Sequence, residues 1–75
     1  MSHKLPRIDP DKMIRILLKL GFSLARTSGS HRIYKSGEKR VVIPYHSGKL
    51  LHPEIVKSII KELGLTEKEF VKLIR

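Results

Sequence analysis

The 75-residue sequence contains no cysteine, and it also lacks asparagine and glutamine. The absence of cysteine excludes disulfide bonds and cysteine-based zinc sites in a chain near the size at which one hydrophobic core is barely sufficient. Hydrophobic residues make up 40% of the sequence, an ordinary share for a globular protein, so residues 1–75 are expected to fold as a single domain. The missing amides, beside abundant lysine, isoleucine and leucine, are typical of proteins from hot environments.

Long apolar runs are absent as well. No uninterrupted apolar segment approaches the length of about 20 residues that spans a bilayer. Residues 1–6 also lack the apolar core of a secretion signal. These absences predict a soluble, cytoplasmic protein that does not associate with a membrane.

Acidic residues are few. The sequence has seven acidic residues and sixteen lysines and arginines, which gives a formal net charge of +9. The excess is concentrated between Arg15 and Pro53, where eight basic residues and one acid, Glu38, give +7. Such a positive field favours a polyanion such as nucleic acid, because each neutralised phosphate releases counterions. A generally basic surface that serves solubility is the alternative.

Apolar periodicity and turn residues predict six elements. Asp9 is a good N-cap and Pro10 a good first helical residue, so a helix is expected over about 10–20, after a flexible lead-in over residues 1–8. Strands are predicted over 22–26, 30–36 and 39–45, a second helix over about 53–63, and a short third helix capped by Thr66. The predicted fold is α+β, in the order α-β-β-β-α-α, with helices packed on one face of a three-stranded antiparallel sheet.

The turn between the second and third strands fixes their register. Gly37 and Glu38 suit a two-residue type II′ turn, because glycine can take the positive φ needed at the first central position. The face predicted to pack against the helices then carries Tyr34, Val41, Ile43 and Tyr45, with Arg32 and Ser30 near its end. The face predicted to stay open to solvent carries His31, Ile33, Lys35, Arg40, Val42, Pro44 and His46.

His31, which follows Gly29 and Ser30, is the leading candidate for a catalytic group. Neutral imidazole can accept and donate a proton near neutral pH. Metal-independent RNA cleavage needs a base for the 2′-hydroxyl, an acid for the leaving 5′-oxygen and positive groups for the crowded phosphorane. Gly29 allows close approach of the backbone to a phosphate, and Ser30 can donate a hydrogen bond to it. The candidate positive groups are Lys35, Arg40 and Lys49.

Each histidine also has a simpler interpretation. A lone exposed histidine on a strand is more often inert than catalytic. His46 is either a second acid/base or orienting group, or a surface residue at a strand end, whereas His52 is expected to start a helix and His3 to lie in the lead-in. A metal site from His31, His46 and His52 is disfavoured, because no cysteine, no His-x-x-x-His pattern and no acidic cluster accompanies them. No metal or other cofactor is therefore expected.

Several short motifs occur in a distinctive order along the chain. They are Leu20-Gly21-Phe22, Gly29-Ser30-His31-Arg32-Ile33-Tyr34, Val42-Ile43-Pro44-Tyr45-His46-Ser47-Gly48 and Leu63-Gly64-Leu65-Thr66. Over roughly residues 9–74 the sequence resembles the HicA family of toxin–antitoxin systems. The resemblance implies a double-stranded-RNA-binding-domain-like fold, metal-independent cleavage of messenger RNA by an endoribonuclease, and a HicB-type antitoxin that covers the active site. It places the family's catalytic histidine on His31, with Gly29 and Ser30 as motif partners, and matches His46 to the family's Pro-x-His position.

One segment departs from the family pattern. His52-Pro53-Glu54 opens the second helix where many members carry a basic loop, which places an acid at the helix N-terminus, a position that otherwise favours phosphate binding. Three functions stay open: a ribonuclease toxin, a non-catalytic RNA-binding module of the same fold, and a small protein-interaction domain whose basic face docks an acidic partner. Without its antitoxin the chain is expected to be a monomer or a weak dimer.

Overall fold

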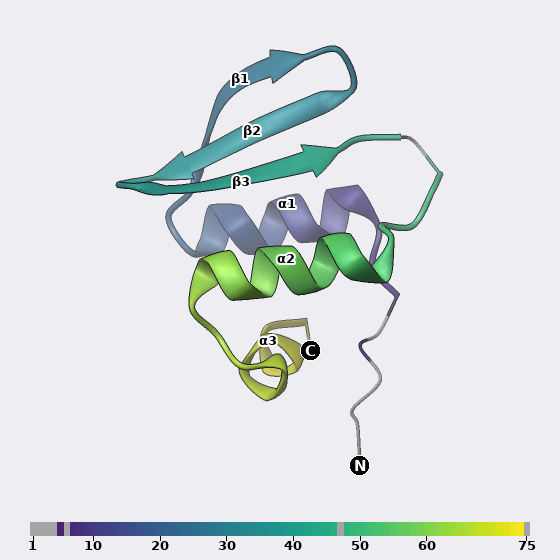
Figure 1. Cartoon of the computed structure of the whole chain (residues 1–75), viewed down its shortest axis with the longest axis vertical. Helices are drawn as coiled ribbons and strands as arrows, with labels where there is room; N and C mark the ends of the chain where they lie inside the picture. The colour runs from purple at the N-terminus through teal and green to yellow at the C-terminus, as the bar shows by residue number, and fades with distance from the viewer. Residues whose placement is uncertain (1–4, 6, 47, 75) are drawn as a thin grey trace.

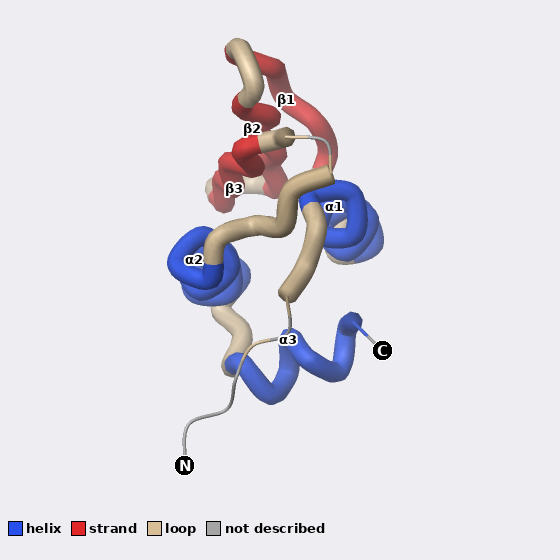
Figure 2. The backbone as a smooth tube through the Cα atoms, turned by 90° about the vertical axis from the view of Figure 1, so that its right-hand side faces the viewer, coloured by secondary structure: helices blue, strands red, loops and turns tan. Residues whose placement is uncertain are grey.

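The computed structural model describes residues 5, 7–46 and 48–74. Its elements are α1 (Pro10–Lys19), β1 (Ser23–Ser28), β2 (His31–Ser36), β3 (Lys39–Pro44), α2 (Pro53–Leu63) and α3 (Glu67–Ile74). The strands form one antiparallel sheet in the order β1-β2-β3. Helices α1 and α2 lie side by side against one face of the sheet, and α3 lies beyond them as a third layer (Figure 1 and Figure 2). The predicted α+β fold, with the element order of a double-stranded-RNA-binding-like domain, is confirmed.

The helices begin where the sequence supplies caps. Asp9 Oδ1 accepts a hydrogen bond from the backbone N–H of Lys12 at 2.7 Å. At the start of α3 the N–H of Thr66 donates to Glu69 Oε1 at 2.8 Å, and the N–H of Glu69 donates to Thr66 Oγ1 at 3.1 Å. Both caps confirm predictions from the sequence. Among the described residues, no helix is both long enough and apolar enough to cross a membrane.

The β2–β3 hairpin has the predicted turn and register. Gly37 has φ of +59°, whereas Glu38 has no positive φ, as a type II′ turn requires. The facing pairs are those expected: Ser36 with Lys39, Lys35 with Arg40, Tyr34 with Val41, Ile33 with Val42, Arg32 with Ile43, and His31 with Pro44. The packed face consequently buries Tyr34, Val41 and Ile43 against the helices.

The outer face of the sheet is less open than predicted. Ile33 lies on this face, yet only 4% of its surface is exposed. It occupies the middle of the central strand, where Arg26 and Val42 flank it from both neighbouring strands. Val42 and Pro44 are half-buried. The expectation of a fully solvent-open face is therefore wrong at these positions.

Strand β1 lies later in the chain than predicted and is poorly covered. It continues to Ser28, with a bulge at Ala25, and the following turn is formed by Gly29 and Ser30. Gly29 has φ of +58°, so it fills the position of this turn that glycine favours. All six residues of β1 are exposed, because the helices lie under β2 and β3 and do not reach it (Figure 1).

The predicted lead-in over residues 1–8 is too long. Only 1% of Ile8 is exposed, and its carbonyl accepts a hydrogen bond from the N–H of Leu51 at 2.8 Å. Leu5 also packs against the core. The expectation of a flexible lead-in is therefore wrong for Ile8, whose apolar side chain joins the core. Residues 1–4 and 6, which include His3, lie outside the described residues.

Candidate active site

His31 is the first residue of β2 and is exposed to solvent. Its backbone is held from both neighbouring strands, because it pairs with Ser28 of β1 and with Pro44 of β3, and the N–H of Tyr45 donates to the carbonyl of Ser30 at 2.7 Å. The Gly29–Ser30 turn precedes it directly. The fold therefore presents this imidazole to solvent on a fixed backbone, directly after that turn.

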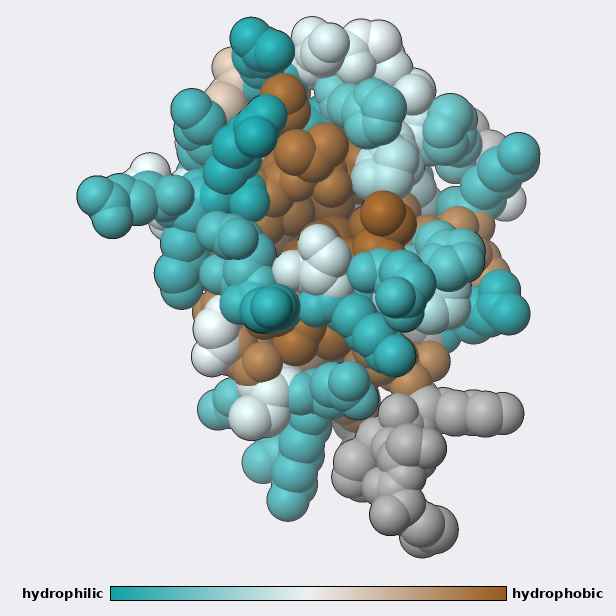
Figure 3. Space-filling view, viewed as in Figure 1, coloured by the Kyte–Doolittle hydropathy of each residue, from teal (hydrophilic) through white to brown (hydrophobic). Residues whose placement is uncertain are grey.

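A groove of about 400 Å³ runs between the sheet and α2. Strand β3 and helix α2 run antiparallel and side by side (Figure 1), and an apolar hollow with a hydrophilic border lies over them in Figure 3. The described residues that line the groove are His31, Arg40, Val41, Val42, Pro44, Ile55, Ser58, Ile59 and Glu62. The first turn of α2 lies at the His31 end. At the other end the N–H of Arg40 donates to Glu62 Oε2 at 3.4 Å.

The candidate positive groups are exposed but do not surround His31. Arg40 lines the far end of the groove, and Lys35 is its partner across the hairpin. Because Lys35 follows His31 by four residues of extended strand, the backbones of these two bases lie roughly 13 Å along the sheet from that of His31. Lys49 lies in the loop before α2, where its N–H donates to the carbonyl of His46 at 3.1 Å. The structure thus brings together Lys35 and Arg40, and separates them from His31.

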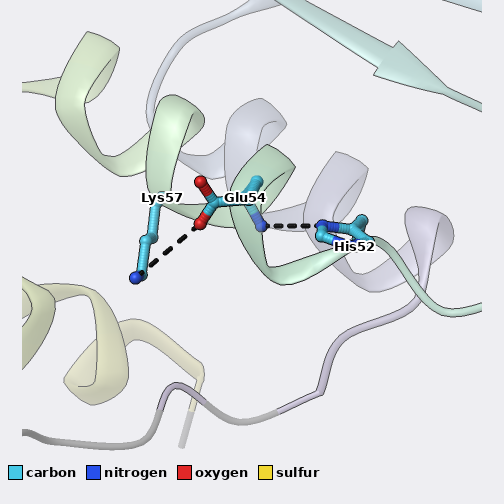
Figure 4. A network of polar contacts seen from close by, with 3 residues as sticks. All are labelled: His52, Glu54 and Lys57. Carbon is cyan, nitrogen blue, oxygen red and sulfur yellow. Dashed lines mark hydrogen bonds and ion pairs between the residues drawn. The ribbon is translucent and has the colours of Figure 1, made fainter.

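The other described histidines lie outside the groove. Strand β3 ends at Pro44, so His46 is an exposed loop residue beyond the sheet. His52 is the N-cap of α2: its Nδ1 accepts a hydrogen bond from the N–H of Glu54 at 3.1 Å, and Glu54 pairs with Lys57 at 3.8 Å (Figure 4). The helix-start role predicted for His52 is confirmed. No three described histidine, aspartate or glutamate side chains lie close enough together to hold a metal ion.

A polar cluster on the packed side of the sheet joins β2 and the end of β3 to α1. The guanidinium carbon of Arg32 lies 3.7 Å from the ring centre of Tyr45, and the Tyr45 hydroxyl donates to Asp11 Oδ1 at 2.8 Å. The hydrogen bond to Asp11 raises the pKa of Tyr45 above its ordinary value. Strand alternation already placed Arg32 and Tyr45 on one face, but it gave no indication of their contact with α1.

Helix α2 supplies the wall of the groove that sequence reasoning missed. The sequence predicts a helix over about 53–63 but assigns no role in a site to Ile55, Ser58, Ile59 or Glu62. The four positions follow the i, i+3, i+4, i+7 spacing of one helix face. That spacing could have grouped them, but it could not show that this face borders the strand that pairs with His31.

Comparison with protein families identifies a match over most of the chain. A family model described as HicA toxin of bacterial toxin-antitoxin matches residues 10–65, which contain α1, the whole sheet and α2. No curated protein matches the chain. The matched segment includes His31 and every described residue that lines the groove.

Proposed function

The chain belongs to the HicA toxin family, and from this premise we propose that it is a metal-independent endoribonuclease that cleaves messenger RNA with His31 as its catalytic acid/base group. The observation that carries the proposal is the position of His31. An exposed imidazole lies at one end of a groove, on a fixed backbone, directly after a glycine turn. A messenger RNA substrate would place this activity in the cytoplasm.

The proposed reaction is an internal transesterification. His31 in its neutral form takes the proton of a ribose 2′-hydroxyl, and the 2′-oxygen attacks the adjacent phosphorus. The bond to the 5′-oxygen breaks, and this oxygen takes up a proton. The products are a 2′,3′-cyclic phosphate and a 5′-hydroxyl end. His46 is the candidate for an orienting or second acid/base group.

The basic residues receive a revised role within this proposal. The backbones of Lys35 and Arg40 lie four strand residues along the sheet from His31, so we assign these two bases to flanking phosphates of the bound RNA. Gly29 and Ser30 lie next to His31 and are assigned to the oxygens of the reacting phosphate. Lys49, in the loop before α2, is assigned to the RNA backbone.

The family also implies a protein partner. A toxin of a toxin–antitoxin system is held inactive by its antitoxin, and we propose that this antitoxin is of the HicB type. The exposure of His31 supports a mode of inhibition in which the antitoxin covers the groove and the imidazole.

Substitution of His31 tests the nuclease directly. Wild-type protein and the His31→Ala variant are incubated with a long unstructured RNA in EDTA, and the products are resolved on a gel. We expect cleavage by the wild type, 5′-hydroxyl ends, and a loss of at least about 100-fold in the variant. His52→Asn is the matched control, because asparagine keeps an N-cap acceptor while the imidazole is removed. Circular dichroism confirms that each variant is folded.

Each other outcome selects a different function. Undiminished cleavage by folded His31→Ala protein would reject the catalytic assignment. Binding without products, for the wild type as well, would favour the non-catalytic RNA-binding module of the same fold. Negligible RNA affinity at physiological salt would favour the protein-interaction domain.

A further inference from the structure

The groove between β3 and α2 is not built like a phosphate site. Its surface is mainly apolar, with contributions from Val41, Val42, Pro44, Ile55 and Ile59. Arg40 also lines it, but its charge is offset by Glu62, the one acid among the described lining residues, and a carboxylate repels phosphate. In a chain with a net charge of +9, this combination suits a flat, uncharged ligand part that donates hydrogen bonds.

We propose that the groove binds a nucleobase of the RNA beside the bond that His31 cleaves, and that Glu62 reads the Watson–Crick edge of this base. The inference rests on the proposed function and names a subsite for it. Unstacked bases are held against apolar or aromatic side chains and are read by hydrogen bonds to their edges. The groove volume of about 400 Å³ lies in the range of ~300–1,000 Å³ that is usual for small-ligand sites.

The length of the groove fits a single nucleotide. Ile55 lies at the His31 end, and Glu62 follows it by seven residues of α2, a rise of roughly 10 Å. A phosphate at His31 and a base edge at Glu62 can therefore belong to the same or to adjacent nucleotides. The apolar side chains between these two ends would contact the faces of the base.

The chemistry of Glu62 favours guanine. The backbone N–H of Arg40 donates to Glu62 Oε2 at 3.4 Å, which holds the carboxylate on the groove wall. Glu62 is exposed, and its two oxygens keep further acceptor capacity. Guanine presents its ring N1–H and its exocyclic amino group side by side, so two donors meet two acceptors. Adenine, cytosine and uracil each present only one donor position on this edge, so none of them can offer two adjacent donors to a carboxylate.

Mononucleotides test the subsite without requiring cleavage. Isotope-labelled wild-type protein is titrated separately with guanosine, adenosine, cytidine and uridine 5′-monophosphate, and backbone amide shifts are recorded by NMR. We expect guanosine monophosphate to shift the amides of Val42, Ile59 and Glu62 and to bind most tightly. Glu62→Gln should weaken this binding on the order of tenfold. Glu38→Gln, which removes the same charge outside the groove, should leave it unchanged.

Cleavage positions provide the second measurement. A randomised RNA is cut by the wild type, and the ends are sequenced. We expect guanine to be enriched at one fixed position relative to the cut. The enrichment should fall on the order of tenfold in Glu62→Gln and persist in Glu38→Gln.

The outcomes separate the subsite from the nuclease. Guanosine monophosphate bound in the groove, without RNA cleavage, would support the base subsite and reject the nuclease. His31-dependent cleavage with no base enrichment, unaffected by Glu62→Gln, would overturn the subsite and leave the nuclease standing. Groove amides that respond to none of the four nucleotides would likewise overturn the subsite, and would leave the groove as a surface for an apolar protein segment.

Discussion

One hydrogen-bonded carboxylate, that of Glu69, makes the stability of this chain depend on pH. Glu69 accepts a hydrogen bond from the backbone N–H of Thr66, which holds the pKa of Glu69 below its ordinary value. A carboxyl group with a lowered pKa stabilises the folded state fully above its unfolded pKa, about 4.3 for glutamate. The contribution is lost as the pH falls through the folded pKa.

We expect Glu69→Gln to remove this pH dependence. Glutamine can fill the same capping position but does not titrate. The stability of the wild type relative to the variant should therefore rise between the folded pKa of Glu69 and about pH 4.3, and stay constant above it. Urea unfolding at a series of pH values, followed by circular dichroism, measures the difference. Glu67→Gln in the same first turn is the control, and parallel profiles for wild type and Glu69→Gln would contradict the prediction.

The site residues differ in how far the sequence could reveal them. His31, Gly29 and Ser30 form one short motif, so local reading was sufficient to group them. The predicted register also gives the separation of His31 and Arg40 along the sheet. Because the two residues share one face of the sheet, Arg40 was expected close to His31, although four strand positions separate them. Glu62 was out of reach, because its contact with Arg40 depends on how α2 packs beside β3.

Among the helices and strands, α3 depends most clearly on one anchor. It lies on the far side of α1 and α2 from the sheet (Figure 2), and Phe70 is the residue of α3 that is fully buried. Leu73 on the same helix is 40% exposed. An eight-residue helix is too short to be stable by itself, so α3 exists through this packing.

Phe70→Ala should therefore be severe for a domain of this size. Removal of a buried phenylalanine costs roughly 3–5 kcal/mol, against a typical total stability of about 5–15 kcal/mol. Leu73→Ala is the control and should cost on the order of 1 kcal/mol or less. Thermal and urea unfolding of both variants measure these losses. Equal destabilisation by the two substitutions would show that α3 is not anchored through Phe70.

The elements themselves were predictable where their cause is local. The Asp9 and Thr66 caps and the Gly37 turn depend on neighbouring residues, and the turn alone fixed the register of β2 with β3. The burial of Ile8 and Ile33 was not predictable in the same way. Each is covered by residues from another segment, which no local pattern identifies.

For the chain as a whole, the charge of +9 should control affinity for RNA. Each phosphate of a single strand that the protein neutralises releases counterions and contributes about −0.7 to the slope of log affinity against log salt. Lys35, Arg40 and Lys49 are exposed candidates for such contacts. Alanine at all three should make the slope shallower by about 2.

Fluorescence anisotropy with a labelled single-stranded RNA measures this slope. The His31→Ala background prevents cleavage during the titration. The matched control replaces three exposed bases on the helices, Lys61, Lys68 and Lys72, with alanine. An equal loss of slope in both triple variants would mean that affinity follows total charge, without a contribution from the positions of Lys35, Arg40 and Lys49.

The poor coverage of β1 has a consequence for local opening. The six residues of β1 are exposed, and β1 pairs with β2 at the edge of the sheet. Separation of β1 from β2 therefore exposes little buried apolar surface to water. Such a strand opens at a lower free energy than global unfolding, and its amide protons exchange with deuterium earlier than those of β3. The pairing of His31 with Pro44 and the hydrogen bond between Ser30 and Tyr45 both lie on the β3 side. Because His31 also pairs with Ser28, opening of β1 frees one side of the His31 backbone and leaves the β3 side paired, which places His31 at the boundary between an opening half and a fixed half of the sheet.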